Sequence, residues 1–150
     1  MIDFENVDCF EKMKSMENNS IDLIMTDPPY GISFKGQTSN TDWDNMTDEE
    51  YSNFLFHLFF EFERILKDDG AIVLFGSQPF ITKLINSNID NYKYSWYWVK
   101  NQGTNFFHAK HMPIRKVEEI AVFNNYLTYN AIKSKGHEPT RSAKGSSNGK

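Results

Sequence analysis

The chain has 150 residues, of which 39% are hydrophobic and 15% aromatic, and its formal net charge is −4. This length suits one globular domain, and this composition excludes a largely disordered chain. The single cysteine, Cys9, excludes a disulfide framework and a cysteine zinc site. No apolar stretch approaches the roughly eighteen residues of a membrane helix, and the N-terminus does not resemble a signal peptide. The sequence therefore predicts a cytoplasmic protein without a membrane segment.

The first half of the chain predicts two helices and the strand between them. Residues 9–18 place apolar side chains at helical spacing, and residues 21–25, IDLIM, are a short apolar strand. A longer helix follows Thr47, because Thr47 and Glu50 have the spacing of a capping box. Lys67 is expected in the last turn of this helix, with Gly70 as the stop signal just beyond it. We expect Met13, Met16 and Met25 in the core.

The second half predicts a further strand at 71–76, a short helix at 79–89, and aromatic or β-branched strands at 92–100 and 117–124. Alternating helices and strands predict an α/β fold with a largely parallel sheet and flanking helices. In such sheets, ligands bind outside the carboxyl ends of the strands. The segment TDPPYG directly follows the strand at 21–25, so it lies where a site is expected.

The corner at 27–31 has the chemistry to hold a planar group that bears an NH2. Pro28 and Pro29 fix their φ angles and remove two backbone donors, which leaves a stiff turn that offers carbonyl acceptors. Asp27 adds a carboxylate, Tyr30 a flat aromatic face, and Gly31 permits close approach of another molecule. An exocyclic amino group on a nucleobase fits these features.

Such an amine is a poor nucleophile because its lone pair is delocalised into the ring. Hydrogen bonds from the amine to Asp27 and to a proline carbonyl would favour a pyramidal nitrogen with an available lone pair. In duplex DNA the base would first have to be flipped out, to stack on Tyr30. The alternative is that Asp-Pro-Pro is an ordinary turn, since these residues dominate turns. Its position after a buried strand favours the functional interpretation.

Positive charge gathers in the second half of the chain, although the whole chain is acidic. From Asn91 to Val117 there is no acidic residue, and this stretch holds the basic side chains that we predict to contact DNA: Lys93, Lys100, Lys110, Arg115 and Lys116. A solvated basic face is the alternative. The aromatic strand at 92–100 offers rings for base stacking, or packs one set of them into the core. His108 and His111 have no acid or cysteine nearby, which favours a solvated loop over a metal site.

The segment TDPPYG after IDLI resembles the catalytic motif of the DNA amino methyltransferases. These enzymes transfer a methyl group from S-adenosylmethionine to adenine N6 or cytosine N4. The segment from Val7 to Gly31 is similar to the start of the family's beta class, in which the catalytic motif precedes the cofactor motif. FERILKDDGAIVLFGSQPF and the segments around Trp98, Lys100 and Glu118 resemble the family's next elements, so the likeness covers about residues 6–124.

The resemblance implies a partial Rossmann-like, S-adenosylmethionine-dependent methyltransferase fold. It implies Asp27, Pro28, Pro29 and Tyr30 as catalytic residues, and Asp8, Asp27 and Pro28 as residues that bind the cofactor. Aspartate in the first position of the motif is more typical of the adenine-N6 enzymes, so adenine in double-stranded DNA is the expected target. Residues 1–130 would be the catalytic portion, and 131–150 a basic flexible tail or the start of a target-recognition region.

The chain departs from the family in one respect: no Gly-x-Gly occurs anywhere in it. In the family, a glycine-rich loop holds the methionine part of the cofactor, so a complementary chain is a candidate to supply that half. Three hypotheses therefore stand. The chain is a truncated or split adenine-N6 DNA methyltransferase, a catalytically inactive remnant that binds DNA or a partner chain, or an N-methyltransferase of RNA or protein amides.

Overall fold

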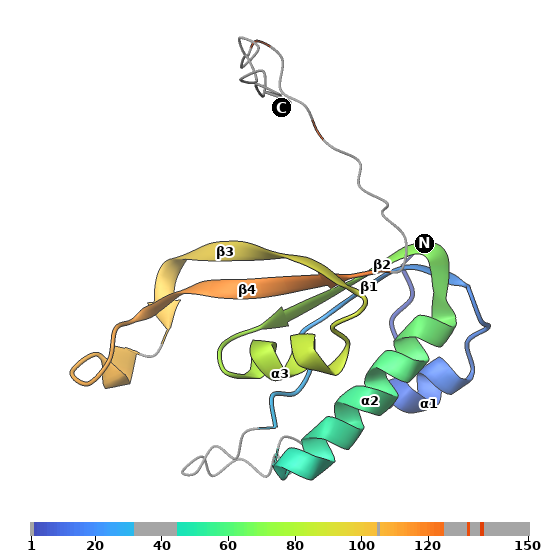
Figure 1. Cartoon of the computed structure of the whole chain (residues 1–150), viewed down its shortest axis with the longest axis horizontal. Helices are drawn as coiled ribbons and strands as arrows, with labels where there is room; N and C mark the ends of the chain where they lie inside the picture. The colour runs from blue at the N-terminus through green and yellow to red at the C-terminus, as the bar shows by residue number, and fades with distance from the viewer. Residues whose placement is uncertain (1, 32–44, 105, 125–131, 133–135, 137–150) are drawn as a thin grey trace, which may run out of the picture.

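A computed structural model describes residues 2–31, 45–104, 106–124, 132 and 136. In chain order, its elements are α1 (Cys9–Lys14), β1 (Ile21–Thr26), α2 (Asp48–Ile65), β2 (Leu66–Gly76), α3 (Phe80–Ser87), β3 (Tyr92–Thr104), the 3-10 turn η2 (Phe106–His108) and β4 (Arg115–Phe123). Apart from residues 132 and 136, the predicted basic tail lies outside the described residues. Figure 1 shows the arrangement of the elements.

The sheet has four strands in the order β1-β2-β4-β3. β1 and β2 are parallel, whereas β4 is antiparallel to both β2 and β3. The α/β class is confirmed, but the prediction of a largely parallel sheet is wrong for the described strands. β3 and β4 follow one another closely and form an antiparallel ribbon, and β4 then inserts between β3 and β2.

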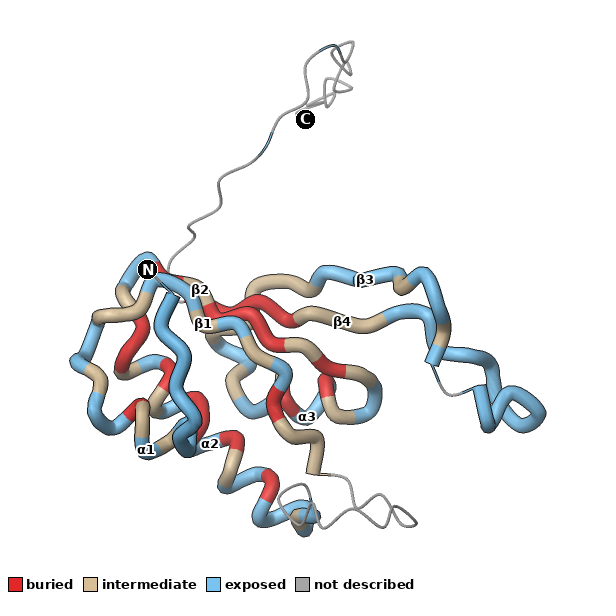
Figure 2. Tube along the Cα trace, turned by 180° about the vertical axis from the view of Figure 1, so that it is seen from behind, coloured by how far each residue is buried: buried red, intermediate tan, exposed pale blue. Residues whose placement is uncertain are grey.

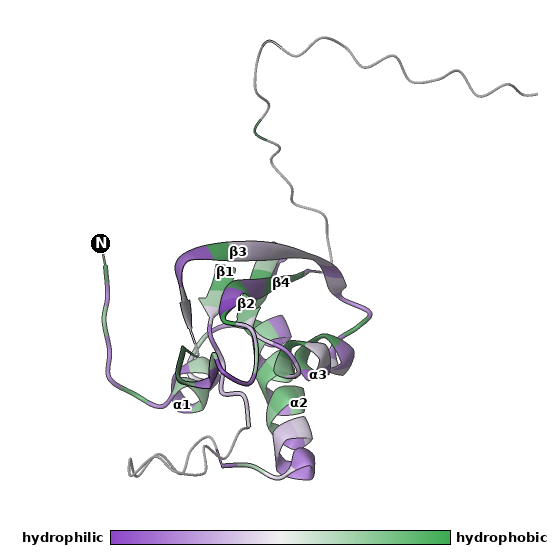
Figure 3. Cartoon of the chain, turned by 90° about the vertical axis from the view of Figure 1, so that its left-hand side faces the viewer, coloured by the Kyte–Doolittle hydropathy of each residue, from purple (hydrophilic) through white to green (hydrophobic). Residues whose placement is uncertain are grey.

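The helices α1, α2 and α3 all lie on one face of the sheet, which we call the covered face (Figure 1). The core forms between them and the strands, and Leu74, Ala121 and Phe123 are fully buried in it. The turns of α2 nearest the sheet are apolar, whereas its first turn, furthest from the sheet, is hydrophilic (Figure 3). Burial of this apolar side is the main source of the helix's stability.

The opposite face of the sheet, which we call the open face, has no helix over it among the described residues. Side chains alternate between faces, so Leu23 and Met25 of β1 lie on this face together with Val73, whose partner is Met25. Leu23 is 51% exposed and Met25 58%. Met13 is buried and Met16 packs against the core, as predicted, but the prediction for Met25 is wrong because its side of β1 is uncovered.

Two boundaries differ from the sequence prediction. The capping box at Thr47 and Glu50 is confirmed, but α2 ends at Ile65 and β2 begins at Leu66. Lys67 therefore belongs to the strand, where its ammonium binds the Asp22 carboxylate at 2.7 Å. Gly70 is also within β2, and a Cβ there would lie 3.0 Å from the Asp22 carbonyl oxygen. This glycine is a site of close strand approach rather than a helix stop.

β3 and β4 extend beyond the rest of the sheet. β2 pairs with β4 only as far as Gly76 and Glu119, while the β3–β4 pairing continues to Thr104 and Arg115. We call residues 98–118, without residue 105, the arm; it projects from the body in Figures 1 and 2. Because β1 and β2 are parallel, the arm extends past the carboxyl ends of both strands.

Candidate active site

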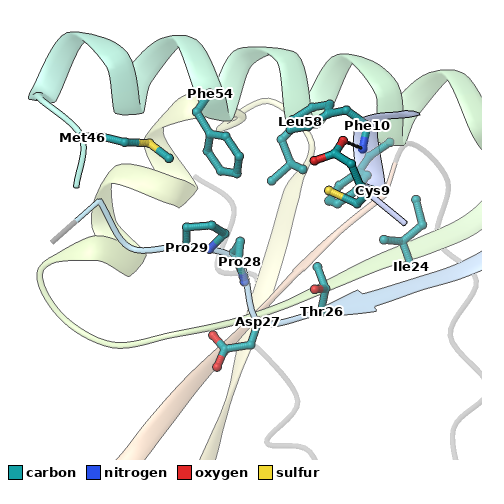
Figure 4. A pocket seen from close by; sticks show the side chains of 12 residues that line it. Cys9, Phe10, Ile24, Thr26, Asp27, Pro28, Pro29, Met46, Phe54 and Leu58 are labelled. Carbon is teal, nitrogen blue, oxygen red and sulfur yellow. Dashed lines mark hydrogen bonds between the residues drawn. The ribbon is translucent and has the colours of Figure 1, made fainter. Parts of the chain in front are cut away.

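A cavity of about 480 Å³ lies between β1 and the helices α1 and α2. Ile24 and Thr26 line it from the strand, Phe54 and Leu58 from α2, and Pro28 from the corner that follows β1 (Figure 4). These walls are mostly apolar, and the volume is in the usual range for small-molecule sites. The sequence-predicted residues Asp8, Asp27, Pro28 and Pro29 all line this one cavity.

Asp27, which lines the cavity, forms a hydrogen-bonded pair with Tyr30. The Tyr30 hydroxyl donates to Asp27 Oδ1 at 2.7 Å, and no other bond to this carboxylate is formed by the described residues. The carboxylate points away from α2 in Figure 4. Partial burial raises the pKa of Tyr30 well above its ordinary value, and the hydrogen bond to Asp27 adds to this rise. The phenol therefore remains a protonated donor throughout the physiological range.

The Tyr30 ring is fixed from behind by Phe80. The two rings are parallel, with centroids 5.2 Å apart and an interplanar angle of 8°. Phe80 follows the carboxyl end of β2, so neighbouring parallel strands bring the two aromatic residues together. Gly31 completes the corner at φ +67°, and a Cβ there would lie 2.8 Å from the Tyr51 side chain. Both the conformation and the space at this position favour glycine.

Asp8 has a structural role as well as a place in the cavity wall. It is the N-cap of α1, where its Oδ1 accepts the backbone N–H groups of Phe10 at 2.9 Å and Glu11 at 3.1 Å. Its Oδ2 accepts no hydrogen bond from the described residues. A carboxylate anchored by one oxygen presents the other at a fixed position. Asp8 can thus cap the helix and accept a ligand's donor at the same time.

The structure divides the predicted DNA-binding residues into separate groups. Lys110, Arg115 and Lys116 are exposed near the end of the arm, and no salt bridge joins them to any described residue. Lys93 lies at the opposite end of β3. Lys100 is largely buried, and its ammonium forms an ion pair with Glu118. Lys100 is therefore engaged within the arm, unlike the exposed group at its end.

The sequence analysis did not identify Phe80, or the Phe54 and Leu58 side chains that close the cavity. Phe80 had a usable signal, because it follows the next strand along the chain, and ligands bind outside the carboxyl ends of such strands. The α2 residues had none, since their spacing indicates only a buried helix face. Among the described residues, no cluster of His, Cys, Asp and Glu suits a metal ion, and no helix is long and apolar enough to cross a membrane.

Comparison with known proteins identifies the family. Residues 21–148 match the family model described as DNA methylase, for N6 and N4 methyltransferases. This match spans most of the chain, which therefore belongs to the amino-methyltransferase family of DNA methylases. The Type II methyltransferase M.HpaI of Haemophilus parainfluenzae is 36% identical over 95 residues, which cover 61% of this chain and 29% of the relative. The Type II methyltransferase M.HinfI of Haemophilus influenzae is 36% identical over 107 residues, which cover 63% of this chain and 28% of the relative.

Solved structures show the same fold. The PvuII DNA methyltransferase, described as cytosine-N4-specific, superposes with a TM-score of 0.59 at 19% identity, over 79% of this chain and 47% of that one. The M1.HpyAVI–SAM complex gives a TM-score of 0.55 at 21% identity, over 93% of this chain and 61% of that one. The fold is that of the DNA methyltransferases. The chain spans less than a third of the length of the two curated relatives.

Proposed function

We propose that this chain forms the catalytic portion of a DNA methyltransferase that transfers a methyl group from S-adenosylmethionine to adenine N6. The observation that carries the proposal is the arrangement of Asp27, Tyr30 and Phe80 at the carboxyl end of β1, beside the apolar cavity. It places an acceptor next to an aromatic face, as the chemistry of a nucleobase amine requires.

In the proposed reaction, Asp27 acts on the target amine. A hydrogen bond from the amine to the carboxylate draws the lone pair out of conjugation with the ring and holds it toward the electrophile. The nitrogen would form the new N–C bond as the bond between the methyl group and the sulfonium breaks, and the proton that the nitrogen then loses would pass to the Asp27 carboxylate. Tyr30 provides the stacking face, and its bond to Asp27 Oδ1 leaves Oδ2 for the amine.

The cavity residues fit the cofactor's adenosine part. Phe54, Leu58 and Ile24 provide apolar walls for a flat ring, and the Asp8 carboxylate provides an acceptor for its polar hydrogens. Bound S-adenosylmethionine would supply an electrophilic methyl group on a sulfonium. The residues for its methionine part are not evident here, since the chain has no Gly-x-Gly, and we propose that a complementary polypeptide supplies them.

Adenine is preferred over cytosine because the motif begins with aspartate at position 27, as in the adenine-N6 enzymes that it resembles. Double-stranded DNA is the proposed substrate, and residues 1–130 the proposed catalytic portion. One alternative is that the chain binds DNA or a partner chain without transferring methyl groups. RNA or protein amides remain alternative substrates, since their planar NH2 groups make the same demands.

The test is methyl transfer from S-adenosylmethionine labelled in its methyl group to duplex DNA. The DNA is then digested, and the label in N6-methyladenine is measured separately from the label in N4-methylcytosine. We expect label in N6-methyladenine, and we expect Asp27→Asn to reduce it at least a hundredfold. Asp22→Asn is the matched control, because Asp22 lies on β1, which Asp27 directly follows, is exposed and binds only Lys67 at the surface among the described residues.

Label in N4-methylcytosine would reject adenine as the target and keep the enzyme class. Equal rates for Asp27→Asn and Asp22→Asn would reject the proposed site. If the folded chain binds duplex DNA but transfers no methyl group even when a polypeptide with the family's glycine-rich loop is added, the alternative of an inactive DNA-binding remnant holds instead.

A further inference from the structure

The end of the arm combines two features that the proposed reaction does not use. Phe106 is 62% exposed and Phe107 is 84% exposed, although both are fully apolar. Their ring centroids are 4.2 Å apart. They are carried by η2, a closed turn in which the Ala109 amide donates to the Phe106 carbonyl at 3.1 Å. The turn therefore presents an ordered pair of aromatic rings to solvent.

Positive charge surrounds these rings. Lys110, Arg115 and Lys116 are exposed, and no acidic residue occurs in the arm before Glu118, which pairs with Lys100. Met112 and Ile114, also in the arm, add exposed apolar surface. A second copy of the chain would bring like charges together at this surface, whereas the phosphates of a nucleic acid are complementary to it.

The position of the arm relates this surface to the candidate active site. From Glu119 to Arg115, β4 extends four residues past the carboxyl end of β2, or about 13 Å at 3.4 Å per residue. Asp27 follows β1 at the same edge of the sheet. A duplex lying across this edge would meet the corner at Asp27 and the end of the arm within a few base pairs.

We propose that the arm binds duplex DNA and that Phe107, backed by Phe106, enters the base stack as an apolar wedge beside the flipped nucleotide. The inference rests on the DNA substrate of the proposed function, and deepens it. Flipping a base leaves a gap in the stack, and an aromatic side chain that fills this gap regains part of the lost stacking. Lys110, Arg115 and Lys116 hold the flanking phosphates.

The test uses two fluorescent duplexes that differ only at one position, where one of them has an abasic site that imitates the gap. Affinities are measured by anisotropy over a range of salt concentrations, and a 2-aminopurine next to the abasic site reports a ring that inserts there. We expect the chain to prefer the abasic duplex about 5- to 100-fold, the range expected for one stacked base.

Phe107→Ala should abolish this preference while keeping the salt dependence, and Phe107→Trp should restore the preference. Lys110→Ala should have the opposite effect. It should keep the preference and lower the slope of log affinity against log salt concentration by about one in magnitude. Phe60→Ala is the matched control, since Phe60 on α2 is 59% exposed and lies outside the arm. Both phenylalanines are exposed, so neither substitution threatens folding.

The proposal is overturned if Phe107→Ala and Phe60→Ala behave alike, or if the chain binds neither duplex at low salt. It is also overturned if Phe107→Ala only dissociates a dimer in sedimentation, or if the arm binds phosphatidylserine vesicles but not DNA. This assay does not measure methyl transfer, so a preference for the abasic duplex would support the wedge even if the separate methylation assay rejected the catalytic proposal.

Discussion

The two faces of the sheet differ in how they are covered. The covered face holds Leu74 and Phe123 under three helices, while the open face leaves Leu23, Met25 and Trp96 half-exposed. Both kinds of residue are large and apolar and come from strands of the same sheet, the buried ones from β2 and β4 and the half-exposed ones from β1 and β3. A parallel pair such as β1–β2 normally has both faces buried. β1 is therefore apolar on both of its faces, as in a strand that is buried on both sides. The described residues cover only one of these faces.

This comparison can be tested directly with two leucines. Leu74 is fully buried on the covered face, and Leu23 on the open face is 51% exposed. We expect Leu74→Ala to lower the free energy of unfolding by about 2–5 kcal/mol, because it leaves a cavity in the core. Leu23→Ala should cost below about 1 kcal/mol. Urea denaturation of both variants measures the difference. Equal losses would show that the open face is covered in solution.

A second prediction concerns how the helix layer is held together. The Arg64 guanidinium donates to the Met13 carbonyl at 2.6 Å, the Met16 carbonyl at 2.9 Å and Asn18 Oδ1 at 2.8 Å, which ties the end of α1 to α2. Arg64→Met removes the guanidinium from the Met16 carbonyl and from the partly buried Glu61 carboxylate, and should cost about 1–3 kcal/mol in the free energy of unfolding.

Lys14→Met is its control. Lys14 binds Glu11 at the surface of α1, so its loss should leave the free energy of unfolding nearly unchanged in the same urea titration. If the two variants were equally stable, the helix layer would depend on apolar contacts alone.

The smallest effect is expected at the start of α2, far from both faces. The backbone amide and the hydroxyl of Thr47 bind the Glu50 carboxylate, and they lower its pKa below the ordinary value. A lowered pKa stabilises the fold above the unfolded-state value, and this contribution is lost as the pH falls through the folded-state value. Helicity measured by circular dichroism should therefore decline on acidification.

Glu50→Gln should remove part of this acid-dependent decline. Glu49→Gln, one residue earlier in the same turn, should leave it unchanged. A decline that is identical in both variants and the parent chain would mean that the capping box adds nothing to the acid response.

Much of the fold was predictable from local patterns. The capping box at Thr47, the apolar spacing of α2 and the short strand before Asp27 were each visible in the sequence and confirmed. The prediction of a largely parallel sheet was wrong because β4 inserts between β2 and β3 and runs antiparallel to both. The place at which a strand inserts into a sheet is not visible in its local sequence. Met25 was placed in the core because an apolar side chain does not reveal whether a helix covers its side of the strand.

The candidate site was predictable to the extent that one segment carries it. Asp27, Pro28 and Tyr30 are consecutive or nearly so, and their chemistry follows from the residue types. Phe80 is the first residue of α3, just after β2, and its place beside Tyr30 follows only once β2 is known to pair with β1. The sequence did not reveal that Lys100 is engaged in an ion pair, because its partner Glu118 is eighteen residues away and meets it across the β3–β4 ribbon.

The stacked pair of Tyr30 and Phe80 gives the site a direction. With Phe80 against one side of the tyrosine, a planar guest can lie only against the other side. The two faces of a nucleobase are distinct, because its sugar and its amine follow one another in opposite order around the ring when it is viewed from its two sides. A single-sided platform therefore distinguishes a base that arrives from one strand from the same base that arrives in the opposite orientation.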